Sequence, residues 1–267
     1  MDRIVIGGGI LEVAVRGAGE PVVLIQTALT ADELFPLADH LALVDGLQPI
    51  AYHRRGYAGS SPTKRPGSIR RDAEDCLELL EGLAIESAHV VGVSYSAAVA
   101  LEVATLDSRR VRTVSVIEPP PVHIPGAAEF VAANESLVDL YETRGPAFAL
   151  DRFMNELMGS DWRTELELVL PGSVQQVERD AATFFGTDIP AILGWDFSIE
   201  KARTVTQPKL YIGGEMSGPW FAQVRDLMVD WLGHPPAVVI SGADHNLAIT
   251  HPGEIARHLV DFFSGFD

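Results

Sequence analysis

One stretch, residues 88–101 (AHVVGVSYSAAVAL), constrains the fold of this chain more than any other. It begins as an apolar run that reaches Ser94, and small and apolar residues then follow in the pattern of a buried helix. Where a strand turns straight into a helix, side chains two positions before and two after the apex collide unless they are small. Gly92 and Ser96 occupy those two positions. The stretch therefore predicts a buried strand, one sharp turn with Ser94 at its apex, and a helix.

Two interpretations of Ser94 follow from this pattern. A serine at the apex of a strand–turn–helix corner is the pattern of a nucleophile elbow, which presents the hydroxyl for chemistry. Here Ser96 stands where such elbows usually have a second glycine. Serine is also a preferred N-cap residue, so Ser94 could instead only cap the helix behind a buried strand. The five residues by themselves leave both interpretations open.

Strands and helices alternate along most of the chain. A hairpin is expected around Gly7-Gly8-Gly9, and because a strand rather than a helix follows these glycines, they do not form a dinucleotide-binding loop. Alternation of this kind predicts right-handed crossovers and an α/β fold, a mostly parallel sheet with both faces covered. Strands are expected over residues 3–6, 10–15, 22–26, 49–53, 90–93, 111–117, 208–212 and 237–240. Helices are expected over 30–43, 68–83, 97–106 and 219–232, and from 252 to the end of the sequence.

Residues 121–206 interrupt the alternation. Only helices are expected there, and the segment is rich in Phe, Trp and Met. A stretch without strands is an insertion rather than a continuation of the sheet. The predicted organisation is a core of residues 1–120 and 207–267, with residues 121–206 as a helical lid.

Charge and cysteine content limit the binding partners and the cellular compartment that we expect for the protein. With 20 Lys and Arg against 37 Asp and Glu, the net charge of −17 argues against a nucleic acid as partner, because such binding depends on neutralising phosphates. The single cysteine, Cys76, cannot form an internal disulfide, which indicates a reducing compartment. No apolar run approaches the ~20 residues of a membrane-spanning helix, and the start MDRIVIGG lacks the apolar core of a secretory signal. We therefore expect a cytoplasmic protein that acts on a small molecule, without a membrane partner; a homodimer is left open.

Over essentially its whole length, the chain resembles the α/β-hydrolase superfamily. The resemblance is carried by the N-terminal hairpin, the strand PVVLIQ, the loop HRRGYAGSSP, the turn GVSYSA, the helical segment and the stretch GADHNLAITHP. It implies a mostly parallel eight-stranded sheet with helices on both faces and an inserted helical cap. In this family the catalytic histidine lies in the loop after the final strand, and His245 occupies that position. His251, directly before Pro252, is better interpreted as a helix cap.

The acidic residue that orients the catalytic histidine in this family is not at its usual position in this chain. Most members have an aspartate after the strand that corresponds to residues 208–212, in a loop resembling G-x-x-D, but this chain has Ser217 there. Glu118, at the carboxyl end of the strand over 111–117, is the preferred replacement because α/β sheets place their sites at that end. Glu215 is the alternative acid, since strands only ~4.8 Å apart could aim either carboxylate at the same imidazole. Glu118 could also be only a capping or salt-bridging carboxylate.

The resemblance also implies two backbone donors for an oxyanion. By alignment these are the N–H groups of Ala28 and of Tyr95, the residue after Ser94. Where the family usually has His-Gly, this chain has QTAL at 26–29, and residues other than glycine restrict the backbone there. Neither a metal nor a cofactor is expected, because the eight histidines show no paired ligand spacing.

The helical lid is expected to decide the substrate. Its aromatic and Met side chains suggest a pocket for a medium-sized, largely uncharged and apolar compound, and the alternative is that such residues only hold the helices together. The residues assigned to the substrate pocket are Leu29, Met154, Trp162, Phe185, Trp195 and Trp220.

The expected function is that of a serine hydrolase. Ser94, His245 and Glu118 would form a triad that cleaves an ester or lactone through an acyl-enzyme. One alternative uses the same site for a carbon–carbon bond hydrolase, lyase, cyclase or cofactor-free oxygenase, with the histidine as base and Ser94 only binding. The other alternative is a non-catalytic ligand-binding protein with this fold.

Overall fold

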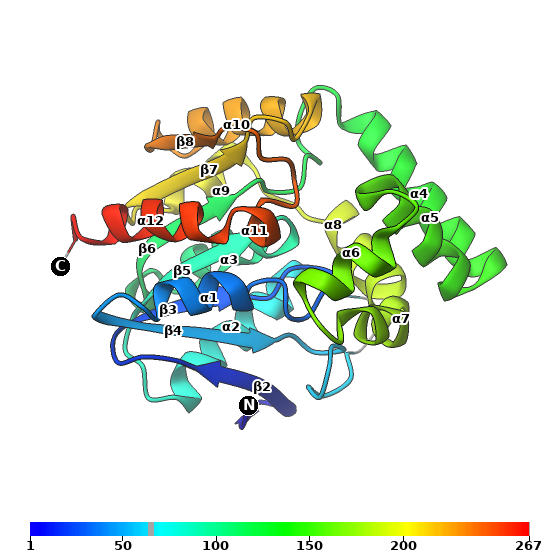
Figure 1. Ribbon diagram of the computed structural model, residues 1–267. Helices are drawn as coiled ribbons and strands as arrows, with labels where there is room; N and C mark the ends of the chain where they lie inside the picture. The colour runs from blue at the N-terminus through cyan, green and yellow to red at the C-terminus, as the bar shows by residue number, and fades with distance from the viewer. Residues whose placement is uncertain (64–66, 267) are drawn as a thin grey trace.

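An eight-stranded, mostly parallel sheet forms the centre of the protein, as the sequence predicts (Figure 1). The computed structural model describes residues 1–63 and 67–266, so residues 64–66 and 267 of the predicted core lie outside the described part. The strand order is β1-β2-β4-β3-β5-β6-β7-β8; β1 and β4 are antiparallel to β2, and all later neighbours are parallel. The strands are β1 Asp2–Ile6, β2 Gly9–Val15, β3 Gly19–Ile25, β4 Gly46–His53, β5 Ala88–Val93, β6 Val111–Ile117, β7 Lys209–Gly214 and β8 Ala237–Ile240.

Helices cover both faces of the sheet. α2 (Ile69–Gly82), α3 (Tyr95–Leu106) and α10 (Pro219–Trp231) share one apolar cluster with the sheet. α1 (Phe35–Leu41), α11 (Leu247–Thr250) and α12 (Pro252–Phe263) share the other. A short 3-10 turn, η1 (Ser108–Arg110), precedes β6.

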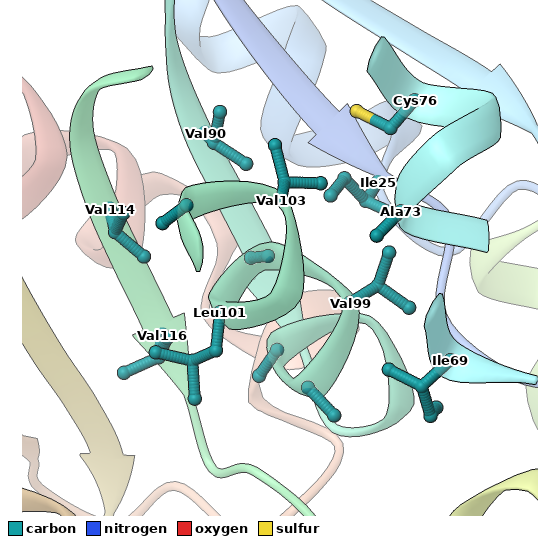
Figure 2. Close-up of a cluster of buried hydrophobic side chains, with 14 of the residues drawn as sticks. Ile25, Ile69, Ala73, Cys76, Val90, Val99, Leu101, Val103, Val114 and Val116 are labelled. Atoms are coloured by element: carbon teal, nitrogen blue, oxygen red, sulfur yellow. The ribbon is translucent and has the colours of Figure 1, made fainter. Parts of the chain in front are cut away.

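The two clusters explain why β5 is apolar throughout. Successive side chains of a strand point to opposite faces, and Val90 joins the α2–α3 cluster whereas Val91 and Val93 join the α1–α12 cluster. Figure 2 shows the first cluster, with Val90 among side chains of α2 and α3. Because both faces are packed, every residue of β5 is buried. The elbow strand is therefore held rigidly behind Ser94.

Helix α1 begins later than the sequence predicts. Residues 30–33 (TADE) have the sequence pattern of a capping box, but the box does not form, because residues 31–34 make a turn and the helix starts only at Phe35. The N–H of Ala31 donates instead to the side chain of Gln176 at 2.9 Å. Pro36 lies in the first turn of the helix, where its missing N–H has no cost.

The chain between β6 and β7 is helical. Its elements are α4 Ala127–Arg144, α5 Pro146–Met158, α6 Trp162–Val169, α7 Ser173–Thr183, the π-helix η2 Phe184–Asp188, α8 Ile189–Leu193 and α9 Ile199–Thr204. Here α4 and α5 form the outer side of this segment (Figure 1). In the part of the chain that the structure describes, no helix is long and apolar enough to cross a bilayer.

Polar ties between this helical segment and the core are unevenly distributed. α7 and η2 are tied by several side chains to loops that follow β3 and β4; the tied pairs are Gln176 with Leu29 and Ala31, Asp180 with Ala58, Thr183 with Gly56, and Asp188 with Arg54 and Tyr57. α5 and α6 differ: among the described residues, their side chains form hydrogen bonds and ion pairs only within the segment.

Candidate active site

Ser94 lies at the apex of the turn between β5 and α3 in a strained backbone conformation. Its φ is 51° and its ψ is −118°, a region that costs on the order of 1–3 kcal/mol for a residue with a side chain. Gly92 permits the turn, because a Cβ there would lie 2.0 Å from the carbonyl oxygen of Ser96. The Ser96 hydroxyl accepts a hydrogen bond from the N–H of Val93 at 2.8 Å and donates to its carbonyl at 3.0 Å. Ser96 thus holds the turn closed without a second glycine.

The side chains of Ser94 and His245 are in hydrogen-bond contact. Ser94 Oγ lies 3.1 Å from Nε2 of His245, across 151 positions of sequence. His245 is in the loop after β8, where the carboxylate of Asp244 accepts from the N–H of Asn246 at 2.9 Å and shapes the turn. The ring of Phe221, from α10, stacks on the imidazole with centroids 3.9 Å apart. These contacts fix the imidazole so that it faces Ser94.

Glu118 holds the other side of the imidazole. Its Oε2 lies 2.7 Å from Nδ1 of His245, and its Oε1 accepts from the N–H of Gly214 at 2.7 Å. The sheet explains this meeting, since the last residues of β5 and β6 are register partners and the residues that follow them are Ser94 and Glu118. Glu118 is 1% exposed and has a φ of 46°, which turns the chain sharply as it leaves β6. The carboxylate is therefore both buried and fully hydrogen-bonded by these two partners.

Glu215, the alternative acid, is bonded elsewhere. Its carboxylate accepts from the N–H of Gly242 at 2.9 Å and from the hydroxyl of Ser241 at 2.8 Å. These bonds, the backbone one first, lower the pKa of the Glu215 carboxyl. Glu215 therefore steadies the turn after β8, and the structure brings Glu118 rather than Glu215 to His245.

The 26–29 loop follows β3 and runs beside the elbow. The Thr27 hydroxyl donates to a backbone carbonyl at the end of β5 at 2.9 Å. Leu29 has a φ of 66°, in the left-handed region that favours glycine, so the strain expected from the missing glycine falls on a leucine. Among the described residues, no acceptor pairs with the N–H of Ala28 or Tyr95. Both donors are therefore free for a ligand, which is what an oxyanion site requires.

Arg54 lies buried beneath this loop. Its guanidinium donates to the carbonyls of Gln26 at 2.9 Å and Thr27 at 3.2 Å. It also pairs with Asp72 of α2 and Asp188 of η2, each at 2.6 Å. Burial opposes the charge, but these carboxylates outweigh it and raise the pKa of the guanidinium. The loop thus rests on a buried cation, and removing this guanidinium would leave two buried carboxyl groups without their positive partner, at a cost of about 3–5 kcal/mol.

A cavity of about 310 Å³ adjoins Ser94 and His245. Its walls come from the 26–29 loop and the residues after it, from α4, α5 and α6, and from the start of α10. Of the residues assigned to the pocket from sequence, Leu29, Met154 and Trp220 line this cavity. Its size is at the lower end of the range for small-molecule sites.

The assignment of Trp162, Phe185 and Trp195 to the pocket is wrong, because none of these side chains lines the cavity. Trp162 is buried in the apolar cluster of the helical segment. Phe185 stacks on Tyr141 with centroids 5.7 Å apart, and Trp195 stacks on Phe197 at 5.0 Å. Aromatic content predicts burial, but the packing among helices decides which rings face a cavity.

Three residues of the site could not be identified from the sequence. Arg54 stands in a loop that the sequence marks as unusual, but its partner Asp188 is 134 positions away. Phe221 is one apolar residue of a predicted helix, with no signal that it stacks on His245. Glu33 carries a helix-capping signal, yet it lines the cavity. Within residues 1–63 and 67–266, no group of three or more His, Cys, Asp and Glu is arranged to hold a metal ion.

Comparisons with known proteins place the fold and the family. The sequence model of the "Alpha/beta hydrolase family" matches residues 17–258. The chain is 26% identical over 259 residues to a putative carbamate hydrolase, RutD, of Pseudomonas savastanoi pv. phaseolicola, which covers 92% of this chain and 95% of that protein.

Solved structures superpose over nearly the whole chain. The enol-lactonase from Burkholderia xenovorans LB400 has a TM-score of 0.82 at 20% identity, covering 98% of this chain and 100% of that one. An alpha/beta hydrolase from Sphaerobacter thermophilus DSM 20745 has a TM-score of 0.72 at 25% identity, with the same coverage of 98% and 100%. The family match includes Ser94, Glu118 and His245. The chain belongs to the alpha/beta hydrolase family.

Proposed function

We propose that this protein is a serine hydrolase that cleaves a small-to-medium, largely apolar ester or lactone. The observation that carries the proposal is the unbroken hydrogen-bond chain from Ser94 through His245 to Glu118, at the wall of a cavity lined mainly by apolar side chains. Membership of the family and relatives that are named as hydrolases support hydrolysis in general. We propose in addition that the substrate is an ester or a lactone and that Ser94, His245 and Glu118 act as nucleophile, base and acid.

In the proposed mechanism, His245 acts as the general base. Its Nδ1–H donates to Glu118 and leaves Nε2 free to accept the proton of Ser94 as Oγ attacks the carbonyl carbon. The imidazolium that forms is stabilised by the buried carboxylate and then protonates the leaving alcohol. An acyl-enzyme on Ser94 remains, and His245 activates the water that hydrolyses it.

The oxyanion of each tetrahedral intermediate would be held by the N–H groups of Ala28 and Tyr95. One such donor contributes about 2.7–4 kcal/mol to lowering the barrier. The contribution depends on a fixed 26–29 loop, and the contacts of Thr27 with β5 and of Arg54 with two loop carbonyls supply that rigidity. Donors already in place need no reorganisation when the charge develops.

Tyr57 provides a test of this loop. Its hydroxyl accepts from the N–H of Leu29 at 3.0 Å and donates to Asp188 at 2.6 Å. Tyr57→Phe is expected to lower kcat by about 10- to 100-fold, because a small shift of the loop misplaces the donor at Ala28. Steady-state hydrolysis of 4-nitrophenyl butyrate measures this effect. Tyr52→Phe removes another buried tyrosine hydroxyl, which does not bond to the loop, and should leave kcat unchanged; equal losses in both variants would contradict the role of Tyr57.

Covalent labelling tests the proposed function directly. A fluorophosphonate probe is expected to label the protein on Ser94, identified by peptide mass spectrometry, and Ser94→Ala is expected to abolish the label. Hydrolysis of 4-nitrophenyl esters and of simple lactones then separates the two proposed substrate classes. A protein that remains unlabelled and turns over neither class would refute the proposal.

The proposed setting is the cytoplasm, with a small molecule as the partner. Cys76 is free and buried, and burial raises the pKa of its thiol to about 12. An inert, unpaired thiol suits a reducing compartment. Fractionation of the source cells, with the protein expected in the soluble cytoplasmic fraction, checks this assignment.

A further inference from the structure

The carboxyl group of Glu33 lies at the cavity wall without a protein partner. Glu33 follows the 26–29 loop in the turn before α1 and lines the same cavity as Ser94 and His245. The adjacent Asp32 differs, since its carboxylate lies 2.8 Å from Nε2 of His53. Glu33 makes no hydrogen bond or ion pair with any described residue, and desolvation is the one influence on its pKa, which it raises to about 8. Without a cation beside it, this carboxyl group is therefore largely protonated at neutral pH, and a bound cation would lower its pKa and hold it ionised.

The cavity offers no cation of its own to this carboxyl group. None of the described residues that line it is Lys or Arg. The other lining acid, Glu156, is ion-paired with Arg152 of the same helix. The histidine of the cavity, His245, is bound to Glu118. Among the described residues the cavity thus has no cation for Glu33, and a ligand could supply one.

Aromatic rings share the cavity with Glu33. Phe130 and Trp220 meet edge to face with centroids 5.5 Å apart, and Phe153 lies 4.8 Å from Phe184. Phe221 also lines the cavity. The faces of aromatic rings attract cations, and alkylammonium groups above all, because such groups carry a charge under an apolar surface. The net charge of −17 further favours the approach of cations.

We propose that Glu33 and the aromatic side chains of this cavity bind an alkylammonium group of the substrate. This inference rests on the proposed function for the reaction and specifies the substrate class as an ester or lactone with an apolar body and one positive charge. Glu33 is then a specificity residue, which contacts the substrate away from the scissile bond. Anionic substrates are disfavoured, because none of the described residues that line the cavity is a Lys or Arg that could pair with them.

Two esters of equal shape provide the test. 4-Nitrophenyl 4-(trimethylammonio)butanoate and 4-nitrophenyl 5,5-dimethylhexanoate differ only in the replacement of a charged nitrogen by a carbon. We expect the wild-type protein to prefer the cationic ester in kcat/KM by roughly tenfold, and Glu33→Gln to abolish or reverse that preference. The ratio is taken within one preparation, so it does not depend on how much of the variant folds. Asp32→Asn, whose native carboxylate pairs with His53, should keep the wild-type ratio.

Binding of butyltrimethylammonium, measured by calorimetry, separates this inference from the proposed function. It is expected to bind Ser94→Ala and to bind the double variant with Glu33→Gln several-fold more weakly. If neither esters nor lactones are hydrolysed and the fluorophosphonate probe does not label Ser94, the proposed function fails, and the calorimetry still decides the ammonium site. If the neutral ester is hydrolysed but Glu33→Gln changes neither the ester ratio nor the ammonium affinity, the role of Glu33 is refuted while the hydrolase remains.

Discussion

Ser94→Ala is expected to lower kcat/KM for 4-nitrophenyl butyrate by about 10⁴- to 10⁶-fold. The hydroxyl oxygen of Ser94 is the atom that the proposed reaction makes covalent, and it lies 3.1 Å from Nε2 of His245, which would take the proton. The presteady-state burst of nitrophenol, which reports the acyl-enzyme, should disappear with the steady rate. Stopped-flow and steady-state measurements on the same sample give both quantities.

Ser115→Ala is the matched control for this substitution. Ser115 is a buried serine of β6, and its hydroxyl has no hydrogen-bond partner among the described residues. Its replacement should leave the burst and the rate near wild-type values. If Ser94→Ala keeps more than a tenth of the wild-type rate, Ser94 only binds the substrate and His245 acts as a base without a covalent step.

Glu118→Gln is expected to lower kcat by about 10³- to 10⁴-fold. The amide would present a donor or a neutral oxygen to Nδ1 of His245, so that the imidazole loses both its preferred tautomer and the charge that stabilises its protonated form. The second oxygen of Glu118 also accepts from Gly214, and a correctly placed amide oxygen can keep that bond. The geometry should therefore survive while the rate falls, which circular dichroism and steady-state kinetics together establish.

Glu215→Gln gives the contrast that assigns the acid. Glu215 is exposed and bonded to Ser241 and Gly242, so its neutralisation should change kcat by less than about threefold. The opposite ranking of the two variants would transfer the role to Glu215. A double variant of Ser94→Ala and Glu118→Gln should be no slower than Ser94→Ala alone, because residues of one catalytic unit are not additive.

The positions of Ser94 and Glu118 could be predicted because strand ends obey simple rules, whereas His245 was located through the resemblance to the α/β-hydrolase superfamily. Apolar runs reveal the strands, parallel neighbours finish at the same edge, and the residues that follow β5 and β6 are therefore side by side. The choice of Glu118 over Glu215 follows from this reasoning, and the contact with His245 agrees with it.

The cavity wall could not be predicted in the same way. Nothing in the sequence distinguishes the aromatic residues Trp162, Phe185 and Trp195 from Trp220. The packing of short helices against one another decides which rings are buried and which face the cavity. The start of α1 at Phe35 could not be predicted either, because the turn before it depends on a hydrogen bond to Gln176 from a distant helix. Interactions across more than a hundred residues leave no local pattern.

The uneven ties of the helical segment limit how a substrate can enter. A swing of the whole segment as one body would pull Asp188 from Arg54 and Gln176 from the 26–29 loop, and it would dismantle the oxyanion site each time the cavity opened. α5 and α6 carry Phe153, Met154 and Leu166 on the cavity wall, and their described polar bonds do not reach the core. We therefore expect an entrance that spares the catalytic geometry to form where α5 and α6 move outward while α7 and η2 stay in place.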